Sequence, residues 1–321
     1  MKVDIQEKIC LNELLQDAKA VAITGHVRPD GDCVGACLGL KNALEHLFPS
    51  LKAEVFLEPI PERFLFLKGA SSIHTEPSDQ AFDVVFALDC NVASRLGRHA
   101  VLLENAKKTV CIDHHISNGP FTDLDYIESE ASSASELVCL LIGTGNLPFA
   151  SCEALYMGIA HDTGIFQYSC TSSRTMRIAG ELMDQGIDYP HIVAKTYYEK
   201  TYYQKQIMGR ALLESVRMLD GKVIFSAIRR KEMDFFCVEP ADLDGIVSEL
   251  RSVEGVEVAI FLYETAPSQF KVSLRSAGRV NVNAVASRFG GGGHKLASGC
   301  EMQGSVHDVI NNLTEWIAVQ L

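Results

Sequence analysis

Side chains that could bind metal ions or transfer protons follow three predicted strands at the points where these strands end. They are His26, Asp30 and Asp32 after the apolar run 20–24, Asp89 after the run 82–88, and Asp113, His114 and His115 after the run 109–112. Because α/β proteins bind ligands at the carboxyl ends of parallel strands, we expect these side chains to share one sheet edge. Asp162 ends an apolar helical pattern and could complete the set.

Each aspartate also has an ordinary structural explanation when it is considered alone. Asp32 could cap a helix, Asp30 and Asp89 could be turn residues, and Asp162 could precede the turn at Gly164. Together, however, these four aspartates would place four negative charges at one sheet edge. Buried like charges repel each other unless cations offset them, and two divalent ions would neutralise this set.

The chemistry of this ligand set indicates phosphoester hydrolysis. A set that is rich in oxygen and contains two imidazoles favours manganese, magnesium or cobalt over a thiolate zinc site. Two such ions about 3.5 to 4 Å apart can activate a nucleophile and clamp a phosphoryl group for in-line attack.

The order of these motifs resembles the DHH phosphoesterase superfamily over nearly the whole chain. The resemblance rests on Asp113-His114-His115, together with His26-x-x-x-Asp30-x-Asp32, Asp89 and Asp162, and on flanking residues such as Arg95, Gly97, Ser132, Ser133 and Phe166. This superfamily includes RecJ-type exonucleases, family II pyrophosphatases, cyclic-dinucleotide phosphodiesterases and bifunctional oligoribonuclease/3′-phosphoadenosine-5′-phosphate phosphatases. The chain resembles the last type. It departs from the expected pattern at Cys33 and at Ala36-Cys37, and Cys33 could make the site sensitive to oxidation.

The resemblance implies two metal ions that share one bridging ligand, Asp89. The first ion would be bound by His26, Asp30 and Asp89. The second ion would be bound by Asp32, Asp89, His114 and Asp162. His115 and Asp89 would be the catalytic residues, with His115 contacting the scissile phosphate or the leaving group. Alternatively, His115 orients a metal ligand.

The pattern of apolar runs predicts an α/β first domain, doubly wound, with a parallel sheet and flanking helices. Continuous apolar strands are expected at 20–24, 53–57, 82–88 and 109–112, with helices at 33–48, 132–142 and 152–159. We expect a DHH domain at 1–190, connecting helices at 191–219 and a smaller α+β domain at 220–321. The active site would lie in the cleft between the two domains.

A glycine run in the second domain indicates a binding site for a phosphate group. Gly290 to Gly293 precede His294 and Lys295, and successive glycine N–H groups can approach an anion without obstruction. The segment resembles the DHH-associated C-terminal domain. The resemblance assigns substrate binding to a set of residues in this domain: Arg275, Ser276, Arg288, Gly291, Gly292, Gly293 and His294. As alternatives, Arg288 could cap its helix and Lys295 could be a solvated surface charge.

Charge and composition restrict the possible partners. The chain has 29 Lys and Arg residues against 41 Asp and Glu residues, a net charge of −12, which argues against binding long duplex nucleic acid. We expect a cytoplasmic protein without a membrane segment, since the N-terminus mixes charges and no long apolar run occurs. Family II pyrophosphatases resemble this chain less well in the second domain, because theirs carries a Ser-Arg-Lys-Lys-type run. No such run is present here, so the resemblance makes pyrophosphate a poor candidate substrate.

We therefore expect a phosphoesterase that depends on two divalent ions, Mn²⁺ or alternatively Mg²⁺ or Co²⁺. Its substrates would be short RNA oligonucleotides, hydrolysed to mononucleotides, and 3′-phosphoadenosine-5′-phosphate, from which it would remove the 3′-phosphate. Alternative activities are a phosphodiesterase acting on cyclic di-AMP or linear diadenylate and an exopolyphosphatase. An alternative of another class is a nucleotide-binding regulator without catalysis.

Overall fold

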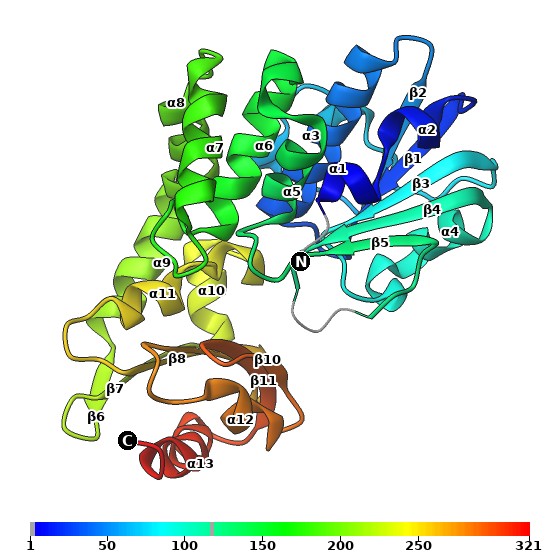
Figure 1. Ribbon diagram of the computed structural model, residues 1–321. Helices are drawn as coiled ribbons and strands as arrows, with labels where there is room; N and C mark the ends of the chain where they lie inside the picture. Colours follow the sequence, from blue (N-terminus) through cyan, green and yellow to red (C-terminus); the bar gives the residue numbers. More distant parts are fainter. Residues whose placement is uncertain (1–3, 116–118) are drawn as a thin grey trace. The chain divides into compact units, whose positions relative to one another are not determined.

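The structure is a computed structural model that describes residues 4–115 and 119–321. The chain divides into two compact units, Met1–Glu199 and Lys200–Leu321, which are described separately here (Figure 1). Within the described residues, no helix is both long enough and apolar enough to cross a membrane.

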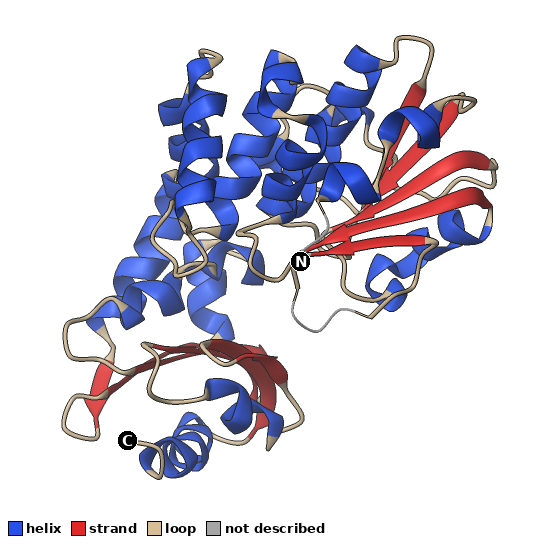
Figure 2. Ribbon diagram, in the orientation of Figure 1, coloured by secondary structure: helices blue, strands red, loops and turns tan. Residues whose placement is uncertain are grey.

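The first unit contains a five-stranded sheet in which every neighbouring pair of strands is parallel (Figure 2). Its strands are β1 (Ala20–Thr24), β2 (Lys52–Phe56), β3 (Phe82–Leu88), β4 (Ala106–Asp113) and β5 (Leu124–Ile127), in the order β2-β1-β3-β4-β5. The predicted α/β class with a parallel sheet is confirmed. Strand β5 was not predicted from the sequence, because it is a short edge strand with only one buried residue.

Both faces of this sheet are buried, which explains its continuous apolar strands. Along β3, Phe86 and Leu88 join the large core that includes the buried side of helix α3 (Gly31–Leu47). The intervening Val85 packs instead with Leu102 of helix α4 (Val101–Glu104) on the other face. Alternate side chains of one strand therefore contribute to two different cores.

The helices of the first unit lie mostly on the α3 side of the sheet (Figure 1). They are α1 (Ile5–Lys8), α2 (Leu11–Leu15), α5 (Ala134–Ile142), α6 (Phe149–Asp162), α7 (Ser173–Asp184) and α8 (Tyr189–Val193). A π-helical turn follows at Ala194–Tyr198. The three helices predicted before residue 160 are present as α3, α5 and α6, with ends that differ by a few residues, as is usual for helix boundaries.

Helices α3 and α6 pack closely because glycines face each other where they meet. A Cβ atom added to Gly35 of α3 would lie 2.5 Å from the Ala154 carbonyl oxygen and 2.9 Å from the Gly158 backbone of α6. A Cβ atom on Gly39 would lie 2.5 Å from the Leu155 side chain. This close approach matters for the site, because α3 carries Asp32 near its start and α6 ends at Asp162.

The second unit contains a six-stranded mixed sheet. Its strands are β6 (Val216–Met218), β7 (Val223–Ile228), β8 (Val258–Ala266), β9 (Gln269–Ser276), β10 (Gly292–His294) and β11 (Ala297–Gln303), in the order β10-β11-β9-β8-β7-β6. Only β7 and β8 pair in parallel. Helices α12 (Val282–Ser287) and α13 (Val306–Ala318) share one core with the sheet. Helices α9 (Tyr202–Leu213), α10 (Arg230–Phe236) and α11 (Ile246–Arg251) share another.

Two segments of the second unit differ from the sequence expectation. The connecting helices that we predicted over 191–219 end at Leu213, and residues 216–218 form strand β6. Strand β6 pairs with β7 through the turn at Asp220 and Gly221, because a positive φ at both residues reverses the chain. The glycine run is also not simply a loop, since Gly292 and the two residues after it form the edge strand β10.

The close packing of α3 on α6 predicts opposite effects of two Gly→Ala substitutions. Gly35→Ala should destabilise the first unit by roughly 1–3 kcal/mol, because its methyl group collides with backbone atoms that cannot move independently. Gly180→Ala in α7 should instead raise stability by up to about 1 kcal/mol, since no atom lies within 4 Å of the added Cβ and alanine favours helix. Scanning calorimetry measures both changes.

The fluorescence of Trp316, the single tryptophan of the chain, provides a control because it lies in α13 of the second unit. Its unfolding transition should stay unchanged in both variants. Equal stability of the Gly35→Ala variant and the native protein would contradict the tight crossing of α3 and α6.

Candidate active site

The order of strands in the first unit brings the predicted metal ligands to one place. Strand β1 has β2 on one side and β3 on the other, so the direction in which strands are added reverses between β1 and β3. Such a switch point is where open parallel sheets bind ligands. His26 follows β1, Asp89 directly follows β3, and His114 directly follows β4.

Asp89 lies at the centre of the cluster. Its Oδ2 is 3.3 Å from His26 Nε2, and its Oδ1 is 3.5 Å from His114 Nε2 and 3.7 Å from His115 Nδ1. The Asp89 side chain is buried, and its backbone has a φ of 53°, a left-handed conformation that is strained for a residue with a side chain. The fold thus holds Asp89 in a costly conformation that aims its carboxylate at three imidazoles.

A second group of ligands forms around His114. Its Nε2 lies 3.2 Å from Asp162 Oδ2 and 3.9 Å from Asp32 Oδ2. Asp162 is the last residue of α6, so the end of this helix supplies a carboxylate to the edge of the parallel sheet. Asp89 contacts His114 as well, which places Asp89 between the two groups.

His26 and Asp30 complete the first group. Asp30 Oδ1 lies 3.7 Å from His26 Nε2. The ring of His26 is oriented by its Nδ1, which donates to the Val27 carbonyl oxygen at 2.9 Å. This hydrogen bond places the proton of a neutral ring on Nδ1, so that the lone pair of Nε2 is available to a cation that also contacts Asp89 and Asp30.

Two aspartates near the start of α3 interact with different helices. Asp30 is the N-cap of α3 and accepts hydrogen bonds from the N–H groups of Asp32 and Cys33. Asp32 is not the cap. Its carboxylate accepts hydrogen bonds from the N–H groups of Ala134 (2.7 Å) and Ser135 (2.9 Å) at the start of α5. The helix-cap alternative therefore describes Asp30 rather than Asp32.

A buried polar network holds the start of α5. Glu136 is fully buried and accepts hydrogen bonds from the Ser132 hydroxyl, the Thr175 hydroxyl and Arg174 Nε. Arg174 also pairs with the buried Glu128 at 2.9 Å. This network connects α7 to the helix end that binds Asp32, and so it helps to fix the position of a predicted metal ligand.

Asp113 orients His115. The Asp113 side chain is fully buried, and His115 Nδ1 lies 2.7 Å from its Oδ1, while the backbone N–H of His115 donates to Oδ2. A carboxylate on Nδ1 fixes the imidazole ring and stabilises its proton there. We had not assigned this role to Asp113 from the sequence. The only signal was its place in the Asp-His-His triplet.

Two carboxylates of the cluster, those of Asp32 and Asp162, are hard to ionise without a nearby cation. Burial raises the pKa of Asp32 to about 7, and the charge of Asp89 adds to this shift. Burial likewise raises the pKa of Asp162 well above its usual range, and Asp32 is the next largest cause. Negative charge at this sheet edge is therefore unfavourable unless positive charge accompanies it.

The imidazoles show the same demand for positive charge. Burial alone would lower the pKa of His26, but its contacts with Asp30 and Asp89 outweigh this effect and raise the pKa to about 12. For His114, burial is likewise outweighed by Asp89 and Asp162, and the pKa rises to about 10. Without metal ions, protons on these rings supply the positive charge that the carboxylates require.

The donor atoms present fit divalent metal ions. Three groups each have donor atoms within 4.8 Å of one another: His26, Cys33 and Asp89; Asp89, His114 and His115; and Asp32, His114 and Asp162. Asp89 Oδ1 is buried and accepts no hydrogen bond from any described residue. A buried carboxylate oxygen without a hydrogen bond is costly, and a bound cation would satisfy it.

The predicted substrate residues all belong to the second unit, and two of them share a sheet face. Arg275 of β9 lies opposite Ala297 of β11, which in turn lies opposite His294 of β10. Directly opposite residues point to the same face, so Arg275 and His294 are neighbours two strands apart, about 10 Å.

Ser276 and Arg288, two further predicted substrate residues, have partners within the second unit. The hydroxyl of Ser276 donates to Glu257 at 3.0 Å and accepts from the Gly278 N–H at 3.0 Å. The guanidinium of Arg288 lies 3.5 Å from the centre of the Trp316 ring. Arg288 thus stacks on an aromatic side chain of α13 at the end of α12.

Three glycines of the run each have a backbone reason for lacking a side chain. Gly290 follows α12 with a φ of 72°. A Cβ on Gly291 would lie 2.2 Å from the Gly299 carbonyl oxygen, and one on Gly293 would lie 2.5 Å from the Ala297 carbonyl oxygen. A Cβ on Gly292 meets nothing closer than 4.0 Å. In the described part of this run, Gly292 is therefore the glycine at which neither the backbone conformation nor a close contact excludes a side chain.

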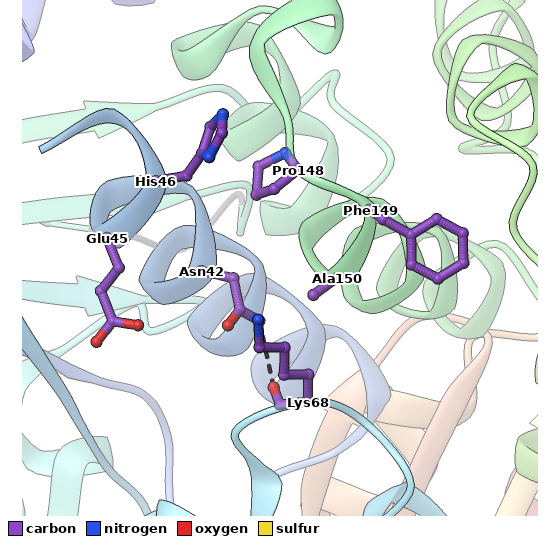
Figure 3. A pocket seen from close by; sticks show the side chains of 7 residues that line it. All are labelled: Asn42, Glu45, His46, Lys68, Pro148, Phe149 and Ala150. Atoms are coloured by element: carbon purple, nitrogen blue, oxygen red, sulfur yellow. Dashed lines mark hydrogen bonds between the residues drawn. The ribbon is translucent and has the colours of Figure 1, made fainter. Parts of the chain in front are cut away.

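A cavity of the first unit lies away from the predicted metal ligands. It has a volume of about 420 Å³ and is lined by Asn42, Glu45, His46, Lys68, Pro148, Phe149 and Ala150. Figure 3 shows that these residues come from the last turns of α3, the first turn of α6 and the Lys68 segment, with the Asn42 amide donating to the Lys68 carbonyl oxygen. Asp32 and Asp162 lie at the opposite ends of these two helices.

The central position of Asp89 predicts that metal ions stabilise the native protein and not the Asp89→Asn variant. Mn²⁺ at a hundredfold excess over its Kd should stabilise the native first unit by about 2.7 kcal/mol, seen as a rise in Tm. The variant should lose most of this rise, because the neutral amide cannot bridge two cations. Calorimetry with and without Mn²⁺ measures the difference.

Asp123→Asn is the matched control, because Asp123 is exposed and accepts hydrogen bonds from Thr109 on the preceding strand. This variant should keep the full rise in Tm on addition of Mn²⁺. An Asp89→Asn variant that responds to Mn²⁺ like the native protein would contradict a bridging role for Asp89.

Comparisons with known proteins agree with this architecture. The family described as "DHH family, N-terminal domain" matches residues 20–159, and the family described as "DHHA1 domain" matches residues 220–319. The chain is 28% identical over 283 residues to the bifunctional oligoribonuclease and PAP phosphatase NrnA of Bacillus subtilis, which covers 86% of this chain and 87% of the relative. A relative of the same name from Thermus thermophilus is 28% identical and covers 88% of this chain and 84% of its own length.

A solved structure supports the same conclusion. The exopolyphosphatase-related protein of Bacteroides fragilis superposes with a TM-score of 0.89 at 26% identity and covers 97% of this chain and 95% of its own. The resemblance seen in the sequence is thereby confirmed. Over most of its length, this chain therefore consists of a DHH family N-terminal domain followed by a DHHA1 domain.

Proposed function

We propose that this protein is a two-metal phosphoesterase that hydrolyses short oligoribonucleotides to mononucleotides and removes the 3′-phosphate of 3′-phosphoadenosine-5′-phosphate. The observation that carries the proposal is the cluster around Asp89, in which two groups of metal-binding side chains share one carboxylate. The substrate class comes from the relatives, since the similar proteins of Bacillus subtilis and Thermus thermophilus bear the name oligoribonuclease and PAP phosphatase.

The first-unit side chains divide into two metal-binding sets in this proposal. His26, Asp30 and Asp89 bind one ion. Asp32, Asp89, His114 and Asp162 bind the other, and Asp89 bridges the two. When bound, the ions would neutralise the phosphoryl oxygens and lower the pKa of an attacking water. We propose manganese as the physiological metal, because an oxygen-rich set with imidazoles suits it, and magnesium and cobalt are the alternatives to test.

His115 and Asp113 act on the substrate side of the reaction in this proposal. Asp113 holds the proton of His115 on Nδ1, since these atoms are 2.7 Å apart. The opposite nitrogen, Nε2, then has a defined direction and binds an oxygen of the scissile phosphate or of the leaving group. Hydrolysis requires a proton to reach the leaving oxygen, and a protonated His115 supplies it through Nε2.

The second unit binds a phosphate of the substrate in this proposal. Arg275 and His294 project from the same sheet face at neighbouring register positions, and a guanidinium can bind phosphate through two parallel hydrogen bonds. A net charge of −12 disfavours the binding of long nucleic acid, whose phosphates require an extended basic surface. Both observations support a short substrate.

A second candidate activity is exopolyphosphatase. The structure with a TM-score of 0.89 is described as an exopolyphosphatase-related protein. Polyphosphate needs only contacts with anions, whereas an oligoribonucleotide also presents bases and ribose. The two activities therefore differ in whether adenine nucleotides compete with the substrate.

The proposal predicts a specific order of substrates in the presence of Mn²⁺. Purified protein should release mononucleotides from di- to pentaribonucleotides and phosphate from 3′-phosphoadenosine-5′-phosphate. It should act more slowly on a long single-stranded RNA, which is not a short chain, and on cyclic di-AMP, which has no free end. It should also act more slowly on pyrophosphate, which offers few groups for the enzyme to bind. Chromatography of the products and a phosphate assay measure these rates.

The Asp89→Ala variant is the control for contaminating nucleases, and it should have no turnover on any substrate. Preferential hydrolysis of polyphosphate without competition by adenine nucleotides would favour the second candidate. A protein that hydrolyses none of these compounds with manganese, magnesium or cobalt would be a nucleotide-binding regulator, and the proposed function would be wrong.

The placement of Arg275 predicts a kinetic effect different from that of Asp89. Arg275→Ala should raise KM by roughly ten- to hundredfold with a smaller change in kcat, because it removes a charged hydrogen bond to a phosphate that does not react. Steady-state kinetics on a trinucleotide measure the two constants.

Lys271→Ala is the matched control on the same strand, since Lys271 pairs with Glu301 at 3.5 Å and lies four residues before Arg275 in β9. Its KM should change little. An Arg275→Ala variant that lowers kcat as severely as Asp89→Ala would contradict a role limited to substrate binding.

A further inference from the structure

Cys33 lies inside the metal-binding cluster, where the expected ligand set has no sulfur. Its side chain is completely buried, and its Sγ lies within 4.8 Å of donor atoms of His26 and Asp89, which are themselves within that distance of each other. All three residues are buried. Cys33 is thus a member of one of three groups in the described residues that could hold an ion.

The position of the sulfur is fixed by the fold. Cys33 is in the first turn of α3, where its N–H donates to Asp30 Oδ1 at 3.1 Å. A Cβ added to Gly25 would lie 2.3 Å from Cys33 Sγ and 3.2 Å from the Leu88 carbonyl oxygen. The sulfur therefore fills the space that Gly25 leaves between the ends of β1 and β3. His26 and Asp89 follow these two strand ends.

A second observation indicates that a cation belongs in this space. Asp89 is only 2% exposed, and its Oδ2 lies 3.3 Å from His26 Nε2. Its other oxygen, Oδ1, lies 3.5 Å from His114 Nε2 and accepts no hydrogen bond from the part of the chain that the structure describes, so the carboxylate lacks the partners that a bound cation would supply. The thiol of Cys33 lies within 4.8 Å of donor atoms of this carboxylate and of the imidazole of His26. These are the three donor types, sulfur, oxygen and nitrogen, that bind transition-metal ions.

We propose that Cys33 is a ligand of the metal ion bound by His26 and Asp89, which gives one of the two metal positions a sulfur donor. This inference rests on the proposed function. On binding, the thiol gives its proton to the solvent and the thiolate forms a bond to the ion, so one proton is released for each thiolate bond formed. Neither the metal nor the sulfur changes its oxidation state.

The sulfur donor makes the two metal positions chemically different. The position of Asp32, His114 and Asp162 has only oxygen and nitrogen donors, which suit manganese and magnesium. The position of Cys33 instead favours ions that bind thiolate well, such as cobalt, zinc and ferrous iron. The proposal therefore includes a mixed pair of ions, in which an ion that binds thiolate well occupies the Cys33 position.

Cobalt provides the experiment, because a thiolate bound to Co²⁺ absorbs in the near ultraviolet by charge transfer, whereas oxygen and nitrogen ligands do not. Metal-free native protein is titrated with Co²⁺, and the absorption and the number of bound ions are measured together. The native protein should bind two ions and show the charge-transfer band. Cys33→Ala should bind cobalt without the band and with an affinity for Zn²⁺ that is at least about tenfold weaker.

Cys37→Ala is the matched control. Cys37 is a completely buried thiol one turn further along α3, and it belongs to none of the ligand groups found among the described residues. This variant should keep the band. A band that persists in Cys33→Ala, or that disappears in Cys37→Ala alone, would overturn the assignment of Cys33.

X-ray absorption on the native protein loaded with cobalt tests the same bond without a variant, and so it does not depend on whether Cys33→Ala folds. A sulfur neighbour at about 2.3 Å from the metal is expected. If two ions bind and hydrolysis proceeds but no sulfur neighbour is present, the inference on Cys33 is wrong and the proposed function stands. If no ion binds, both are wrong.

Discussion

The structure of the active site depends on the repulsion between carboxylates that the fold forces together around Asp89. Asp32 and Asp89 are almost completely buried, and His114 lies within 4 Å of both of them and of Asp162. Ionised carboxylates that surround one side chain in a buried site strongly destabilise one another. The raised pKa values of His26 and His114 reflect the same excess of negative charge, because a proton on each imidazole supplies positive charge to the neighbouring carboxylates. Divalent ions satisfy the same demand.

The scaffold meets this demand by fixing each ligand through a different part of the fold. The switch between β1 and β3 places His26 beside Asp89, and the start of α5 holds the carboxylate of Asp32 through two N–H groups. The crossing of α3 and α6 sets the distance from Asp32 to the end of α6. Gly158 is required there because a Cβ would lie 2.0 Å from Ser135 Oγ and 3.0 Å from Asp32 Oδ1. These side chains come from the ends of β1, β3 and β4, the start of α3 and the end of α6, so packed strands and helices position all of them, which favours a preorganised centre.

Much of the fold could be predicted because burial on both faces leaves a simple pattern. The continuous apolar runs of β1, β3 and β4 are visible in the sequence, and so are the helical patterns of α3, α5 and α6. Strands β5 and β10 were missed because they are short edge strands with little burial. The connecting helices expected over 191–219 end early because residues 216–218 pair with β7, a contact that tertiary structure decides.

The sequence by itself determined which residues could take part in the chemistry. His26, Asp30, Asp32, Asp89, His114, His115 and Asp162 stand at strand or helix ends, and an ordered set of acids and imidazoles indicates metal chemistry wherever the chain brings them together. Only the tertiary structure decided how they are held. Hydrogen bonds from α5 to Asp32, the contact of Asp113 with His115 and the place of Cys33 beside His26 all join residues through distances and directions in space. Residue types and spacing do not specify such directions, because they depend on how separate elements pack against one another.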